Sequence, residues 1–227
     1  MKKFLFMAAM MFAGINQSHA AERLSVVELF TSQGCSSCPP ADEYLGELAE
    51  RDDVLALAYH VDYWDYIGWK DQFASAAFTQ RQRTYARQFN LRYVYTPQMI
   101  VSGRYENSGN RQDVIRRAIS ADQREAFLID LQHQGNTITL TGPQQDEELL
   151  VYHVQYYREV ETDVKRGENR GRKLTEFNIV KSLTPLGLWQ GQTSKFEVAK
   201  ETRDRNIGDA IFVQRPNDLQ ILTAFKL

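Results

Sequence analysis

The two cysteines of this chain, Cys35 and Cys38, are separated by two serines and follow an apolar run from Val26 to Phe30. The run predicts a β-strand, and a helical pattern begins after the cysteines. Two thiols at this spacing can form a disulfide reversibly, and the N-terminus of a helix stabilises a thiolate. The pattern therefore predicts a redox-active CxxC site in the loop between the strand and the helix.

A structural crosslink is the alternative interpretation of the same pair. Stabilisation by a disulfide grows with the length of the closed loop, and the chain-entropy estimate is roughly 2 kcal/mol for so short a ring, against about 4.7 kcal/mol for a 100-residue loop. Because Cys35 and Cys38 join neighbouring residues, redox chemistry is the favoured interpretation.

The sequence around the pair predicts different roles for the two thiols. We expect Cys35, which lies farther from the helix, to be the exposed nucleophile and Cys38 to be the shielded resolving thiol. Proline is tolerated in the first turn of a helix, so Pro39 and Pro40 place Cys38 at or next to the N-cap. Pro39 also favours an extended backbone at Cys38.

Glu28 is a candidate proton donor and acceptor. It shares one side of its strand with Val26 and Phe30, so apolar neighbours on both faces of the strand would bury its carboxylate. Burial raises the pKa of a carboxyl and would suit Glu28 to exchange protons with Cys38. A solvated glutamate at a sheet edge is the alternative.

His60 follows the apolar run from Val54 to Tyr59, which predicts a second strand. A strand–helix–strand unit makes the two strands parallel, so His60 and the cysteine loop are expected at the same edge of the sheet. There His60 could supply a proton or lower the pKa of Cys35. The alternative, which we favour, is a structural histidine in a hydrogen-bonded loop with Asp62 and Asp65.

A copper or zinc site is a further possibility, because both metals favour sulfur and imidazole ligands. Cys35, Cys38 and His60 make an incomplete ligand set, and His133 and His153 lie in the other half of the chain. We therefore expect no metal and no other cofactor.

The N-terminus has the three regions of a secretory signal peptide. Lys2 and Lys3 precede an apolar stretch from Phe4 to Ile15, and the small residues around Ala20 suit cleavage. About 12 apolar residues are too few for a spanning helix, which needs roughly 20. We expect residues 1–20 to be removed and the protein to be periplasmic or secreted, with no later transmembrane segment.

Removal of that leader leaves 25 basic and 29 acidic residues, a formal charge of −4. A mildly acidic chain gives no support for nucleic-acid binding, which normally requires a basic surface. The oligomeric state is not predicted.

Residues 21–127 alternate between strand-like and helix-like patterns and predict an α/β domain with a mixed sheet and a helical insertion. Beyond Phe127 the hydrophobic period changes to two, which predicts an antiparallel β-sandwich-like module over residues 128–227. Helices are expected at 41–50, 71–89 and 111–127, and strands at 26–30, 54–59, 98–102, 128–132, 137–141, 149–160, 174–183, 194–199, 210–214 and 219–225.

Thr96 and Pro97 stand immediately before the strand at 98–102. Together with the strand–CxxC–helix order, they give the first half a resemblance to the thioredoxin-like fold, in which a similar dipeptide has a cis peptide bond and faces the cysteine pair. The resemblance implies that Thr96 offers backbone groups to an extended substrate and that Pro97 shapes the pocket. Thioredoxins also carry a buried acid near the position of Glu28, with a spacing one residue shorter.

A closer resemblance covers nearly the whole chain after the leader. The segments at 28–42, 60–65, 68–71, 81–82, 95–98, 167–169 and 171–172, together with Leu174, resemble the secreted thioredoxin-like family catalogued as domain of unknown function 1223. The resemblance implies the fold but no activity. The tryptophan that precedes the first cysteine of thioredoxins is replaced by Gly34.

Two loops are chemically distinctive. Tyr63, Trp64, Tyr66 and Trp69 crowd one short loop, where they could dock a substrate or, as we favour, fill a gap beside the sheet. The segment from Lys165 to Lys173 holds five cationic side chains, which favour a solvated loop over binding to an anionic lipid or polyanion.

These observations predict an exported thiol–disulfide oxidoreductase in which Cys35, Cys38, Thr96, Pro97, Glu28 and His60 form the site. Its partner would be a protein or small-molecule thiol or disulfide, and the direction of electron transfer is open. The alternatives are a non-catalytic binding or assembly protein and a copper-handling protein.

Overall fold

The computed structural model describes residues 24–124, 128–198 and 204–227, so the expected leader lies outside the described residues. The described helices are α1 (Pro39–Ala49), α2 (Ala76–Gln88) and α3 (Gln112–Asp122), with a short 3₁₀ helix η1 (Asp65–Ile67). The strands are β1 (Ser25–Thr31), β2 (Val54–His60), β3 (Gln98–Val101), β4 (Tyr105–Ser108), β5 (Asp130–Gln134), β6 (Thr137–Thr141), β7 (Leu149–Asp163), β8 (Lys173–Trp189), β9 (Ser194–Glu197), β10 (Ile207–Gln214) and β11 (Ile221–Lys226).

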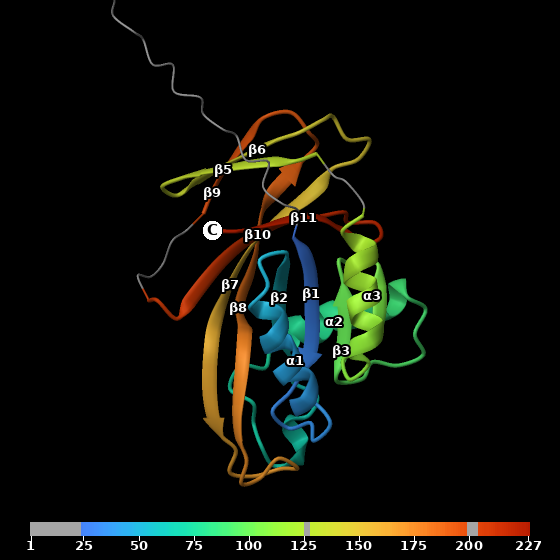
Figure 1. Cartoon of the computed structure of the whole chain (residues 1–227), viewed down its shortest axis with the longest axis vertical. Helices are drawn as coiled ribbons and strands as arrows, with labels where there is room; N and C mark the ends of the chain where they lie inside the picture. Colours follow the sequence, from blue (N-terminus) through green and yellow to red (C-terminus); the bar gives the residue numbers. More distant parts are fainter. Residues whose placement is uncertain (1–23, 125–127, 199–203) are drawn as a thin grey trace, which may run out of the picture.

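The fold is a mixed α/β fold built on a large mixed sheet with a few helices (Figure 1). Eight strands form this sheet in the order β11-β10-β7-β8-β2-β1-β3-β4, and a second sheet has the order β5-β6-β9. Strands β1 and β2 are parallel and run in register from Ser25 opposite Val54 to Thr31 opposite His60. The predicted strand–helix–strand unit and its parallel pairing are confirmed.

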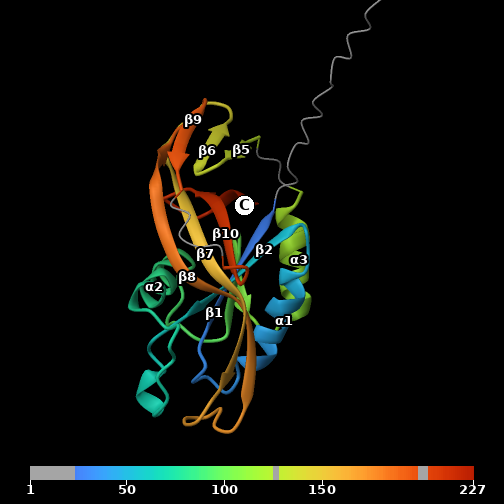
Figure 2. The ribbon, with the colours of Figure 1, turned by 90° about the vertical axis from the view of Figure 1, so that its left-hand side faces the viewer.

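Strand β1 is buried on both faces, and its successive side chains point alternately toward helices on the two faces of the sheet. Val27 and Leu29 pack with α1 and α3, whereas Val26 and Phe30 pack with residues of α2. Figure 2 shows the same division, with α1 and α3 on one side of the sheet and α2 on the other. The continuous apolar run of β1 is therefore that of a central strand covered by helices.

The sequence predicts a separate antiparallel module in the second half of the chain, but four strands of that half, β7, β8, β10 and β11, belong to the large sheet. Strand β8 joins β2 in a parallel pairing at Ala58 and Ile179, so the large sheet includes strands from both sides of the expected boundary at residues 127 and 128. Among the described residues, β5, β6 and β9 form the second sheet, which packs on the large sheet through Ile138 and Leu140. A period of two reveals strands but not which strand becomes the lateral neighbour of β2.

Two further elements differ from expectation. Helix α2 begins at Ala76, not near Asp71, because the Ser75 side chain caps it by accepting the Ala77 N–H at 3.2 Å. Strand β4, which pairs with β3, is not predicted because its residues are polar and partly exposed. In the part of the chain that the structure describes, no helix is long and apolar enough to cross a membrane.

Candidate functional site

The two cysteines form a disulfide at the N-terminus of α1, with their Cα atoms 5.4 Å apart. Cys38 is the N-cap and Pro39 opens the helix, as predicted. The expected extended backbone at Cys38 is wrong, since φ −79° and ψ −37° are helical. Its carbonyl accepts the N–H groups of Ala41 at 2.8 Å and Asp42 at 3.1 Å, which holds Cys38 in the first turn.

Both cysteines are buried, so the expectation that Cys35 is exposed is also wrong. Cys35 is 1% exposed and Cys38 is 0% exposed, although the two serines between them face solvent. A turn far away in sequence contacts this loop. Asn169, between β7 and β8, donates to the carbonyls of Gln33 at 2.9 Å and Cys35 at 3.0 Å. The β7–β8 turn is therefore part of the site, which sequence reasoning missed because the two segments lie more than 130 residues apart.

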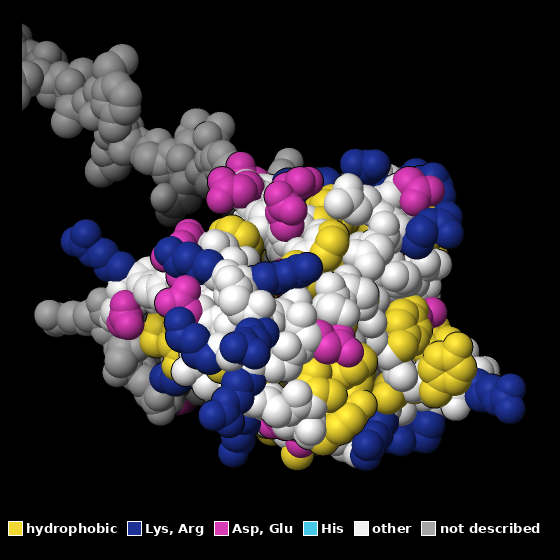
Figure 3. Space-filling view, turned by 90° about the horizontal axis from the view of Figure 1, so that it is seen from below, with side chains coloured by type: hydrophobic (Ala, Val, Ile, Leu, Met, Phe, Trp, Pro, Cys, Tyr) yellow, Lys and Arg dark blue, Asp and Glu magenta, His cyan; other side chains and the backbone are white. Residues whose placement is uncertain are grey.

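The outer side chains of the β7–β8 turn are solvated, as predicted for the basic segment. Its five cationic side chains are exposed, and Lys165 and Lys173 pair with acidic neighbours at 3.4 Å and 2.7 Å. Figure 3, viewed from the end of the molecule where this turn lies, shows lysine and arginine side chains among acidic and hydrophobic ones. Glu168 is turned toward the cysteines, where it accepts the Ser36 N–H at 3.2 Å.

Thr96 and Pro97 directly precede β3, and the peptide bond between them is cis. A Cβ atom added to Gly109 would lie 2.8 Å from the Cβ of Ala41 and 3.4 Å from that of Pro97, so Pro97 approaches the first turn of α1. Trp64 connects the aromatic loop to this region, because its indole N–H donates to the Thr96 hydroxyl at 2.8 Å. The structure thus brings Thr96 and Pro97 close to the start of α1.

His60 is fully buried and ion-paired beneath the cysteine loop. Its Nδ1 lies 2.8 Å from Asp71 Oδ2, and its Nε2 lies 3.7 Å from Glu176 Oε1. Burial lowers the pKa of His60, but the negative charges of Asp71 and Glu176 outweigh burial and raise the pKa to about 9. The imidazole is therefore charged at neutral pH and held by carboxylates, which supports a structural role for His60. The expected partners Asp62 and Asp65 are wrong, because Asp62 accepts the Thr79 hydroxyl and Asp65 accepts the Asp71 N–H.

Gln33 links this buried cluster to the cysteines. Its backbone N–H donates to Asp71 Oδ2 at 2.9 Å, and its side-chain amide donates to Glu176 Oε2 at 2.7 Å. The Trp69 indole N–H in turn donates to Gln33 Oε1 at 3.0 Å. Because Gln33 precedes Cys35 by two residues, the cluster fixes the path of the loop.

Asp42 is a buried carboxyl that sequence reasoning missed. It accepts a hydrogen bond from the Thr31 hydroxyl at 2.7 Å and is 7% exposed. Burial, followed by the charge of Glu176, raises the pKa of Asp42 to about 7. The available signal was its position four residues after Cys38, which places it one helical turn along the same side of α1.

Glu28 is fully buried, so the expected burial is confirmed and a solvated edge position is wrong. Its Oε1 lies 2.6 Å from Arg81 Nε, and its Oε2 accepts the Tyr85 hydroxyl at 2.5 Å. Both partners belong to α2, whereas Cys38 begins α1 on the opposite face of the sheet. Glu28 therefore faces α2, whereas a proton-exchange partner of Cys38 was expected to face the cysteine pair at the start of α1.

Within residues 24–124, 128–198 and 204–227, no group of three or more His, Cys, Asp or Glu side chains could hold a metal ion. His60 is hydrogen-bonded to Asp71 through Nδ1 and ion-paired with Glu176 through Nε2. The geometry gives the copper hypothesis no support.

Two solved structures are similar to this fold. Protein AGR_C_4864 from Agrobacterium tumefaciens is 34% identical, with a TM-score of 0.77, and the match covers 91% of this chain and 95% of that chain. HBP35 of Porphyromonas gingivalis is 14% identical, with a TM-score of 0.56 over 91% of this chain and 75% of that chain, and is a likeness of fold alone. No curated protein matches. The family described as "Protein of unknown function (DUF1223)" matches residues 26–214, and this chain belongs to that family.

Proposed function

We propose that this protein is an exported thiol–disulfide oxidoreductase, periplasmic or secreted, whose first half has a thioredoxin-like arrangement. The observation that carries the proposal is the Cys35–Cys38 disulfide at the start of α1, close to the loop that holds Thr96 and Pro97. A helix N-terminus favours the thiolate form of a nearby cysteine. The proposed partners are protein or small-molecule thiols and disulfides.

In the reduced protein, the Cys35 thiolate attacks one sulfur of a substrate disulfide and displaces the other sulfur, which takes up a proton. Cys38 then loses its proton, attacks the Cys35 sulfur and releases the second substrate thiol. The substrate gains two electrons and two protons, and the Cys35–Cys38 disulfide forms. The reverse steps oxidise a substrate dithiol.

Asp42 is the proposed acceptor of the Cys38 proton, the role that the sequence suggested for Glu28. It lies one turn after Cys38 on α1, and its pKa of about 7 lets it gain or lose a proton near neutral pH. Thr96 would bind the backbone of an extended substrate, and Pro97 would shape the contact surface.

Access to the sulfur atoms requires a local movement, because Cys35 is 1% exposed. The β7–β8 turn is the segment proposed to move. In the described part of the chain, the hydrogen bonds that join it to the cysteine loop are the two of Asn169 and the one from the Ser36 N–H to Glu168. Breaking them leaves the large sheet intact.

The decisive experiment measures alkylation of the reduced protein from pH 5 to 8 together with exchange against glutathione disulfide. We expect Cys35 to react faster than an ordinary thiol, with a pKa well below about 8.5. Cys38→Ser should keep this reactivity and accumulate a mixed disulfide, whereas Cys35→Ser should lose both. A Cys35 thiol with ordinary reactivity that does not exchange with a disulfide would overturn the proposal.

A non-catalytic binding or assembly protein is the second candidate, and the burial of both cysteines favours it. In that case the disulfide would be a permanent crosslink. A reduction potential near or below about −300 mV would favour this candidate, whereas a value near about −120 mV would favour an oxidant.

A further inference from the structure

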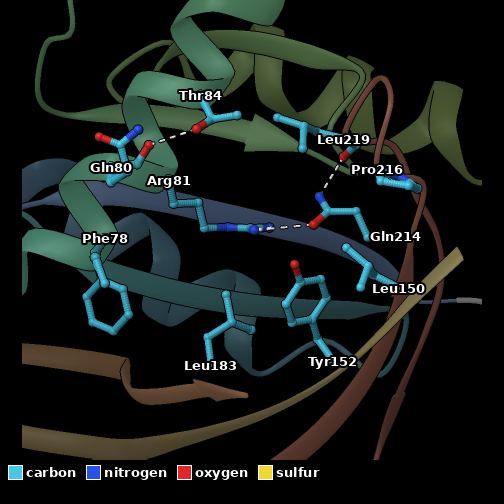
Figure 4. Close-up of a pocket in the computed structure, with 11 residues that line it drawn as sticks. Phe78, Gln80, Arg81, Thr84, Leu150, Tyr152, Leu183, Gln214, Pro216 and Leu219 are labelled. Carbon is cyan, nitrogen blue, oxygen red and sulfur yellow. Dashed lines mark hydrogen bonds between the residues drawn. The ribbon is translucent and has the colours of Figure 1, made fainter. Parts of the chain in front are cut away.

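A cavity of about 310 Å³ lies between α2 and the strands of the second half, on the face of the sheet opposite to α1. Its walls are mainly apolar and include Phe78, Leu150, Leu183 and Leu219 (Figure 4). This volume is at the lower end of the range for small-molecule sites, about 300–1,000 Å³. The cavity has room for a compact ligand of one or two rings.

Arg81 supplies the cationic group of the cavity. Its guanidinium donates to Glu28 Oε1 at 2.6 Å, to Gln214 Oε1 at 3.2 Å and to the Tyr85 hydroxyl at 3.2 Å. It also stacks on aromatic rings, with its Cζ 5.2 Å from the centre of the Tyr85 ring. A guanidinium has five N–H donors, so two remain beyond these three bonds.

Tyr152 provides a second polar group from the opposite wall. Figure 4 shows its hydroxyl pointing toward the hydrogen bond between Arg81 and Gln214. Among the described residues, no hydrogen bond to the Tyr152 hydroxyl is present, and its ring is held against Phe212 with the ring centres 5.2 Å apart. The hydroxyl is therefore free to bind a ligand atom.

The charged side chains at the cavity, Arg81 and Glu28, determine whether the polar group of a ligand can be anionic or must be neutral. Glu28 already neutralises Arg81 at 2.6 Å, so an anionic ligand would meet a carboxylate next to the guanidinium. A neutral acceptor oxygen gains hydrogen bonds without this repulsion.

We propose that this cavity binds a neutral, mostly apolar small molecule whose carbonyl oxygen accepts hydrogen bonds from Tyr152 and Arg81. Apolar walls bury the body of the ligand, and the polar groups orient it. This site lies on the α2 face of the sheet, so it does not depend on the chemistry proposed for the cysteines.

Three probes of nearly equal shape test the proposal by isothermal titration of the oxidised protein: 2-acetylnaphthalene, 2-ethylnaphthalene and 2-naphthoate. We expect 2-acetylnaphthalene to bind best. Loss of both hydrogen bonds should weaken the binding of 2-ethylnaphthalene by about 25-fold, about fivefold for each bond. The charge of 2-naphthoate should also make its binding weaker than that of 2-acetylnaphthalene. Failure of all three probes to bind at millimolar concentration, or tightest binding by 2-naphthoate, would overturn the proposal.

Two variants locate the bound probe. Leu183→Trp fills the cavity and should abolish binding, whereas Leu188→Trp, on the same strand but 53% exposed and outside the lining, should not. Tyr152→Phe preserves the ring and should weaken 2-acetylnaphthalene by about fivefold while leaving 2-ethylnaphthalene unchanged. Unchanged binding of 2-acetylnaphthalene to Leu183→Trp or Tyr152→Phe would contradict the assigned site.

Discussion

At the scale of single residues, Asp42 is the buried carboxyl on the helix that Cys38 caps. It lies on α1 one turn after Cys38 and changes charge near neutral pH, since its pKa is about 7. Glu28 is equally buried, but Arg81 holds it on the other face of the sheet. The two residues show that burial alone does not place an acid near the two cysteines, because the face of the sheet on which the acid lies also matters.

The raised pKa of Asp42 predicts a specific dependence of stability on pH. The folded protein holds this proton more tightly than the unfolded chain, so the contribution is complete below about pH 4 and is lost as pH rises to about 7. Asp42→Asn removes this dependence, and at pH 8 we expect it to raise the free energy of unfolding relative to wild type. The gain is about 4 kcal/mol at most, from a shift of about three pKa units at about 1.4 kcal/mol per unit.

Urea denaturation of the oxidised protein at pH 4, 6 and 8 measures this effect. Glu43→Gln on the same helix is the matched control, because Glu43 is exposed. His60, whose pKa is raised to about 9, adds a separate loss of stability between about pH 6.5 and 9 in the wild type and in both variants, Asp42→Asn and Glu43→Gln. Equal slopes for wild type and Asp42→Asn between pH 4 and 7 would contradict the assigned pKa.

At the scale of elements, the turn between β7 and β8 is hydrogen-bonded to the cysteine loop, and we propose that it limits access to the disulfide. Asn169→Ala removes both hydrogen bonds to the cysteine loop and leaves the carbonyls of Gln33 and Cys35 without them. We expect a loss of about 1–3 kcal/mol in the free energy of unfolding and a severalfold faster reduction of the disulfide by dithiothreitol.

Arg170→Ala is the control for this turn, since Arg170 is exposed and adjacent to Asn169. It should leave the rate of reduction unchanged. If Asn169→Ala is reduced no faster than Arg170→Ala under conditions in which both remain folded, the turn does not cover the disulfide.

Gly46, where α1 packs on β8, is a helical glycine that we expect to be more stabilising than alanine. Replacing a glycine inside a helix by alanine normally stabilises a protein by about 0.5–1 kcal/mol. A Cβ at Gly46, however, would lie 2.5 Å from the ring of Phe177, so helix and strand must separate. We expect Gly46→Ala to lower the free energy of unfolding by about 1–3 kcal/mol, and Phe177→Leu to reduce this loss in the double variant. A stabilising Gly46→Ala would show that the ring moves freely.

The sequence predicts individual elements better than their lateral neighbours. Local patterns predict the central elements: the apolar runs indicate β1 and β2, and the prolines after Cys38 indicate the start of α1. The contacts of Asn169 with the cysteine loop and of Glu28 with Arg81 join residues distant in sequence, and no local period reports them. The burial of Cys35 follows from such contacts, which is why its exposure was predicted wrongly.

One sheet joins the two halves of the chain at the scale of the whole molecule. Asn178 on β8 donates its side-chain amide to the carbonyl of Ala56 on β2 at 2.9 Å, next to the pairing of Ala58 with Ile179. The core cluster on the α2 face contains residues of β1 and β2 together with residues of β7, β8, β10 and β11. The proposed redox site is likewise shared, since Cys38 caps α1 and Asn169 of the β7–β8 turn donates to the carbonyl of Cys35.

This shared core predicts that the first half cannot fold alone. A fragment ending at residue 127 exposes the edge of β2 and the apolar side of α2 that packs against β7 and β10. We expect the fragment to lack dispersed amide signals in NMR, and the full chain to unfold in one transition by both circular dichroism and tryptophan fluorescence. A natively dispersed spectrum from the fragment, or two separate transitions in the full chain, would instead indicate two independent domains.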